Sequence, residues 1–152
     1  MVIVLIGLLS FGASSLFSSK GTYVEYLAKE RLLSLGLLAQ QVALGVSAPA
    51  MPVPVSPPIV LPDPAAITIT RSVSDDLTIS LQKLGQTFQT FTLDTSVPIP
   101  AINGVALASG SARVFTWDRN ANMKDGLNQE VRFTGDTTYR VCFSASGYVY
   151  ES

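Results

Sequence analysis

The chain has 152 residues, of which 47% are hydrophobic and 14% are charged, and its formal net charge is −1. This composition excludes a disordered polar chain, and the near-neutral charge without a basic tail gives no indication of nucleic acid binding. Histidine is absent and Cys142 is the single cysteine. The sequence therefore lacks the usual general base and zinc ligand, and no disulfide can form within it.

The first charged residue is Lys20, and residues 1–19 form an uncharged, largely apolar run. As a helix this run would be about 28 Å long, against about 30 Å for the hydrocarbon core of a bilayer. We expect it to lie in a membrane or in the core of an assembly, where small residues allow close helix contact. A cleaved secretory signal peptide is the alternative, although no Lys or Arg precedes the run. The side chains expected to pack against neighbouring helices are Val4, Gly7, Leu8, Phe11 and Gly12.

Residues 20–46 have the spacing of an amphipathic helix that continues the apolar run. Glu25 and Lys29 lie off the apolar stripe, and their separation favours an ion pair along the helix. We expect the stripe to pack on a sheet, as in any core-facing helix. The residues of the stripe are Val24, Ala28, Leu32, Leu35, Ala39 and Val42.

Residues 47–64 contain seven of the nine prolines, a density that ends the helix and favours extended polyproline II structure. We expect a semi-rigid connector between the helix and a globular domain. A docking motif for a proline-reading partner is the alternative.

From residue 65 to residue 152 the apolar period changes to two, which predicts β-strands. Strands are expected at 67–70, 77–81, 88–93, 113–117, 130–134, 139–143 and 148–150, with a turn at Asp75-Asp76. A loop is expected over 97–110, with a short strand at 105–107. One helix followed by antiparallel strands predicts an α+β domain in which a sheet covers the stripe of the helix.

The run Val2-Ile3-Val4-Leu5-Ile6-Gly7-Leu8-Leu9, followed by small residues and an amphipathic helix, resembles the N-terminal helix of type IV pilins and pseudopilins. In that family the mature chain opens with Phe-Thr-Leu-Ile-Glu-Leu, with a glycine where Gly7 stands, so the resemblance puts Met1 inside the mature protein. The end of the chain, residues 141–150, is similar to that of MSHA-type minor pilins.

The resemblance implies a pilin-like fold and a structural subunit of a type IV pilus-like or type II secretion-like filament. Such a subunit sits in the bacterial inner membrane by a single pass, with its domain in the periplasm, and later enters a pilus that serves cell adhesion. Its partners are other pilin subunits and the assembly machinery. The alternative is a single-span, membrane-anchored periplasmic binding module that does not polymerise.

An oxygen-rich cluster begins in the pattern of a calcium loop but lacks the glycine and glutamate that an EF-hand requires. Its members are Asp118, Asn120, Asn122 and Asp125. A plain Asx-rich turn is the alternative to calcium. No base lies beside a nucleophile, so we expect neither catalysis nor another cofactor. We expect Cys142 to be a small buried residue of a strand, and a sugar platform built from Trp117 or Tyr150 is a further alternative.

Overall fold

The computed structural model describes residues 20–46, 62–93 and 98–152. The predicted apolar run at residues 1–19, with Val4, Gly7, Leu8, Phe11 and Gly12, lies outside these ranges. Most of the predicted connector at residues 47–64 also lies outside them.

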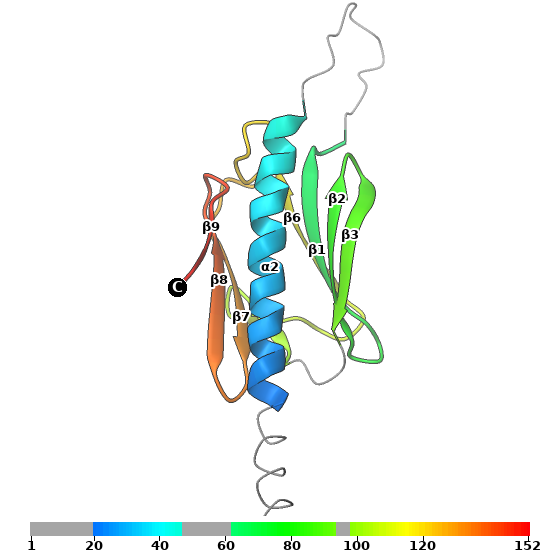
Figure 1. Cartoon of the computed structure of the whole chain (residues 1–152), viewed down its shortest axis with the longest axis vertical. Coiled ribbons are helices and arrows are strands. Elements are labelled where there is room, and N and C mark those ends of the chain that lie inside the picture. Colours follow the sequence, from blue (N-terminus) through cyan, green and yellow to red (C-terminus); the bar gives the residue numbers. More distant parts are fainter. Residues whose placement is uncertain (1–19, 47–61, 94–97) are drawn as a thin grey trace, which may run out of the picture.

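One helix, α2 (Lys20–Gly45), runs along the long axis of the described part of the molecule, with strands on both of its sides (Figure 1). The strands are β1 (Ala65–Arg71), β2 (Leu77–Lys83), β3 (Gln86–Leu93), β4 (Pro100–Ile102), β5 (Val105–Ala106), β6 (Ala112–Trp117), β7 (Gln129–Thr134), β8 (Thr138–Phe143) and β9 (Val149–Glu151).

The strands form two antiparallel sheets. The four-stranded sheet has the order β3-β2-β1-β6, and the five-stranded sheet has the order β5-β4-β7-β8-β9. Because α2 contacts strands of both sheets, it is shared between them. The predicted α+β class is confirmed, but the expectation of a single sheet over the helix was wrong.

The second sheet changes which helix residues are buried. Ala28, Leu32, Leu35 and Ala39 are buried as predicted, whereas Val24 and Val42 are only partly buried at the rim of the core. A helix covered from two sides buries more than one narrow stripe. Glu25, Lys29, Gly36 and Ala43 are therefore also buried.

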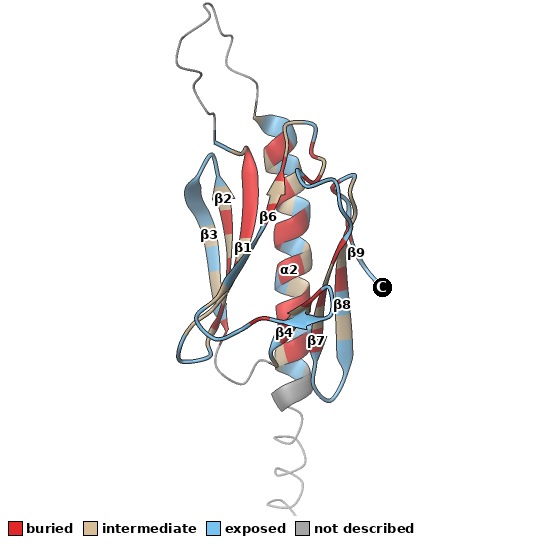
Figure 2. Ribbon diagram, turned by 180° about the vertical axis from the view of Figure 1, so that it is seen from behind, coloured by how far each residue is buried: buried red, intermediate tan, exposed pale blue. Residues whose placement is uncertain are grey.

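Alternation along the strands gives each sheet one face toward the helix. In the four-stranded sheet the buried residues include Ile67 and Ile69 of β1 and Ile79 of β2, whereas β3 is mostly exposed (Figure 2). The predicted strands all lie within or overlap observed ones. The loop expected over 97–110 contains β4 as well as the short strand β5, because Asn103 and Gly104 adopt positive φ and close a tight hairpin.

Aromatic side chains join the two sheets. The ring of Phe115 on β6 stacks on that of Phe143 on β8, with 4.7 Å between centroids, and Trp117 meets Phe143 edge-on at 5.8 Å. Cys142 lies on the other face of β8 and is only half-buried. The expectation that it is buried was wrong, because Val141 and Phe143 occupy the core-facing positions of that strand.

Candidate functional site

Glu25 ties the helix to the turn between β7 and β8. Its side chain is almost fully buried, and its two carboxylate oxygens accept hydrogen bonds from the backbone N–H groups of Asp136 (3.1 Å) and Thr137 (3.2 Å). A side chain at Gly135 would collide with this carboxylate. The contact therefore requires a glycine in the turn as well as the acid on the helix.

Lys29 ties the same helix to the C-terminal strand. It is 4% exposed, and its Nζ lies 2.9 Å from Glu151 of β9 and 3.0 Å from Glu30. The rings of Tyr26 and Tyr139 lie 4.5 Å and 5.3 Å from the same Nζ, within the range of a cation–π contact. Burial lowers the pKa of Lys29, but the hydrogen bonds and charges of Glu151 and Glu30 outweigh it and raise the pKa above its usual 10.5.

The ion pairs of Lys29 differ from the prediction. Among the described residues its partners are Glu30 and Glu151, not Glu25. Glu25 lies one turn earlier and is engaged by turn amides instead. The i,i+4 spacing permits a pair on an isolated helix, but here a neighbouring sheet supplies better partners for each charge.

One face of α2 is left open by both sheets. Its exposed apolar side chains are Tyr23 (65% exposed), Tyr26 (45%), Leu37 (46%) and Leu44 (63%). Leu37 follows Tyr26 by eleven residues, or about three helical turns, and Leu44 follows Leu37 by seven residues, or about two turns. These side chains therefore lie along one line of the helix. We call these four residues the open stripe of α2. The exposed polar residues Ser34 and Gln41 lie on the same face, so the open stripe is a mixed surface of apolar and polar groups.

Side chains of the oxygen-rich cluster form hydrogen bonds with residues of their own loop. Oδ1 of Asp118 accepts hydrogen bonds from the backbone N–H groups of Asn120 (2.8 Å) and Asn122 (2.9 Å), the pattern of an Asx turn. Asp125 accepts a hydrogen bond from Leu127 N at 3.1 Å and one from the Gln129 amide at 2.7 Å. Within the described ranges no three or more His, Cys, Asp or Glu residues gather as a metal site would require. This geometry favours the Asx-turn interpretation over the calcium site.

Trp117 is fully buried, and its Nε1 donates a hydrogen bond to the backbone oxygen of Gly147 at 3.2 Å. A sugar platform needs an exposed ring face, so Trp117 cannot provide one. Tyr150 is half exposed on β9.

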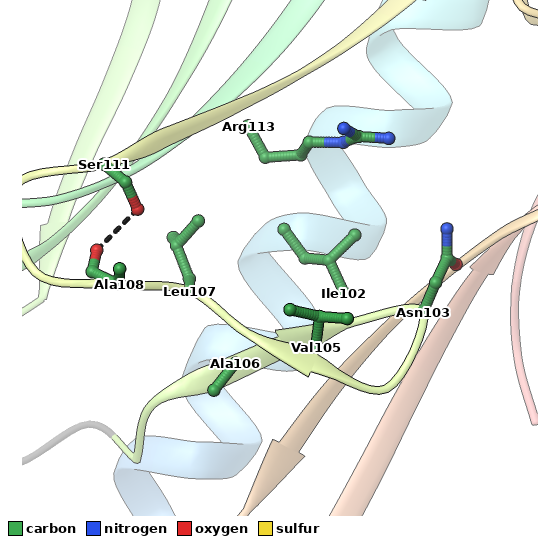
Figure 3. Close-up of a pocket in the computed structure, with 8 residues that line it drawn as sticks. All are labelled: Ile102, Asn103, Val105, Ala106, Leu107, Ala108, Ser111 and Arg113. Atoms are coloured by element: carbon green, nitrogen blue, oxygen red, sulfur yellow. Dashed lines mark hydrogen bonds between the residues drawn. The ribbon is translucent and has the colours of Figure 1, made fainter.

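A pocket of about 470 Å³ lies between the β4–β5 hairpin and β6, as Figure 3 shows. Ile102 and Leu107 are its most buried lining residues, whereas Val105 is 72% exposed. Arg113 is its one charged lining residue. Sequence reasoning missed this pocket because its lining comes from a segment that we expected to be mostly loop.

Comparison of the chain with protein-family models, with curated proteins and with solved structures gives no match. No helix in the described part of the chain is long and apolar enough to cross a membrane.

Proposed function

We propose that this protein is a minor pilin or pseudopilin, a structural subunit of a type IV pilus-like filament of the MSHA type or of a type II secretion-like filament. Residues 1–19 hold the subunit in the bacterial inner membrane, with the α+β domain in the periplasm. On assembly the subunit leaves the lipid and packs against the helices of neighbouring subunits. The role is mechanical and requires no catalytic group.

The open stripe of α2 is the observation that carries the proposal. A helix that serves only its own domain would expose polar groups on its uncovered face. The uncovered face of α2 presents Tyr23, Tyr26, Leu37 and Leu44, with the exposed polar residues Ser34 and Gln41 between them. In a filament this face packs against helices of other subunits.

The buried charges of α2 also support a structural role. Glu25 and Lys29 fix the helix to the β7–β8 turn and to β9 through contacts between residues more than a hundred positions apart. A subunit that transmits force along a filament needs a helix that does not slide against its domain. Buried polar contacts of defined geometry supply that restraint, because they are lost on a small displacement.

The proposal is tested by placing one charge on the open stripe in the cells that produce the protein. In Leu37→Lys and Leu44→Lys variants we expect the amount of subunit in sheared surface filaments to fall by about tenfold, since burying a charge costs well over the 1.4 kcal/mol of a tenfold effect. The matched control is Leu84→Lys, which adds the same charge at an exposed leucine in the β2–β3 turn. Equal filament content in all three variants would contradict the proposal.

A second measurement separates this proposal from the membrane-anchored binding module. For a pilin we expect an in-frame basic leader ending in glycine, then Phe-Thr-Leu-Ile-Glu-Leu, in the DNA directly upstream of the Met1 codon. N-terminal sequencing of the membrane-extracted protein would then begin at that processed site. An upstream stop codon with Met1 intact would favour the anchored module instead.

A further inference from the structure

The pocket of Figure 3 lies between two strands that are each the last strand of a sheet. β6 is the outermost strand of the four-stranded sheet, and β5 is the outermost strand of the five-stranded sheet. Both strands supply residues to the pocket, Arg113 from β6 and Val105 and Ala106 from β5. Outermost strands carry backbone groups that are free to pair with another extended chain.

The register of β6 identifies those groups. The backbone hydrogen bond from Arg71 N to Ser111 O, together with the pairing of Ile69 with Arg113, directs the backbone groups of Arg113 toward β1. The N–H and C=O groups of Ala112 and Val114 therefore point away from β1. Among the described residues they have no hydrogen-bond partner in the backbone.

At its other end the same edge forms an isolated bridge with the turn that follows β6. Lys124 N donates to Thr116 O at 2.9 Å, and Trp117 forms a bridge with Met123. Thr116 is two residues beyond Val114 and so has the same outward orientation. The outward backbone groups at this end of β6 are therefore accessible to backbone hydrogen bonds, and the bridge ends before the pocket.

The side chains of the pocket indicate what such a strand would carry. Arg113 shares its face of β6 with Phe115 and forms no ion pair within the described residues. On a strand paired with β6, residues that alternate along the chain project onto this face. An acidic residue next to Arg113 complements its positive charge. An aliphatic residue two positions away on the same strand packs on the apolar side chains of Ile102 and Leu107.

A second copy of this chain does not provide that strand. Pairing β6 with the β6 of a second copy would bring two Arg113 side chains together, which is unfavourable. The edge strand β3 has no charged residue within Gln86–Leu93, and Glu151 of the edge strand β9 is already bound by Lys29. The edge strands β3, β6 and β9 of a second copy therefore offer no free carboxylate for Arg113, which favours another protein as the source of the complementary charge.

We propose that the pocket between β5 and β6 binds an extended, acidic segment of a partner protein by strand addition to the free edge of β6. The segment carries a carboxylate beside Arg113 and an aliphatic side chain over Ile102 and Leu107. This inference goes beyond the filament role and does not depend on it.

The test uses the full chain in detergent and the synthetic peptide acetyl-Thr-Val-Thr-Glu-Thr-Val-Thr-amide as the probe. We expect saturable shifts of the Ala112 and Val114 amide signals in nuclear magnetic resonance spectra. A control peptide with Lys in place of Glu should bind about tenfold more weakly. Absence of saturable shifts, or equal affinity for the two peptides, would overturn the proposal.

Two variants of one residue separate strand addition from nonspecific contact. Val114→Pro removes the outward N–H without breaking the β1–β6 ladder, and should abolish peptide binding. Val114→Thr keeps the N–H and should bind like the unaltered protein. Binding retained by Val114→Pro would contradict strand addition.

If Val114→Pro loses the near-ultraviolet dichroism of buried Trp117, and so fails to fold, Arg113→Glu replaces it. That variant should prefer the Lys peptide over the Glu peptide, and an unchanged preference would overturn the proposal. Sedimentation of the chain alone completes the test. Self-association that Val114→Pro or Arg113→Glu removes would identify a second copy as the occupant and contradict a separate partner.

Discussion

The two sheets hold the same helix in different ways. The four-stranded sheet presents fully buried aliphatic residues such as Ile67, Ile69 and Ile79, and its cationic contact is the exposed Arg31 over the ring of Phe91. The five-stranded sheet adds the buried Glu25 and Lys29 contacts and a close backbone approach at Gly36. Apolar contact supplies most of the free energy of folding but tolerates sliding, whereas directional polar contacts fix position. The first sheet therefore stabilises the helix, and the second sheet also sets its register.

The largest effect should come from removing apolar volume on the four-stranded sheet. We expect Ile69→Ala to lower the free energy of unfolding by about 2–5 kcal/mol, because Ile69 is fully buried and the sheet cannot close the cavity. The measurement is urea unfolding, with a lower midpoint and an unchanged slope. The control Thr68→Ala, on the outer face of the same strand, should change stability by less than about 1 kcal/mol. Equal losses in the two variants would mean that the helix-facing side is not the core.

A smaller effect is expected from adding a side chain at Gly36, where α2 lies close to the five-stranded sheet. A Cβ at this position would lie 2.8 Å from Cγ2 of Val149, so Gly36→Ala should cost about 1–3 kcal/mol through overpacking. Adding Val149→Ala to that variant should restore part of the loss, and a double-mutant cycle measures this coupling. Gly45→Ala is the matched control, because a Cβ there meets nothing within 4 Å. Additive effects of the Gly36 and Val149 substitutions would contradict a direct contact.

The smallest effect concerns the charge of Lys29, since its partners Glu30 and Glu151 are 42% and 48% exposed at their side chains and solvent screens them. The pKa of Lys29 is raised in the folded state, so its stabilising contribution is complete below the unfolded-state pKa of 10.5 and is lost as pH rises through the higher folded-state pKa. Urea unfolding of the protein and of Lys29→Met should therefore show a stability difference that shrinks above about pH 10.5. A difference that stays constant through this range would show that the charge of Lys29 contributes nothing.

Alternation along the strands was sufficient to predict most of the fold from the sequence. β1 and β2 each place apolar residues at every second position, and this pattern does not depend on whether the strands form one sheet or two. β4 was not predicted, because its three residues, Pro100–Ile102, are too few to show the two-residue period of a strand. The number of sheets could not be predicted, because it depends on pairing between distant segments.

The polar contacts of the helix could not be predicted for the same reason. Glu25 and Lys29 have the spacing of an exposed pair, and their actual partners, Thr137 and Glu151, lie 112 and 122 residues further along the chain. Nothing in a local window distinguishes a solvated charge from one that a distant turn or strand will cover. The free edge of β6 is likewise visible only once the order of the strands is known.

The outward position of Cys142 has a practical consequence. It is the one thiol of the chain, and its residue pairs with Glu130 of β7 on one side and with Tyr150 of β9 on the other. A fluorophore or spin label attached there would occupy a single known site at the centre of the C-terminal hairpin. Such a label would report on β8 and its neighbours β7 and β9 without any engineered cysteine.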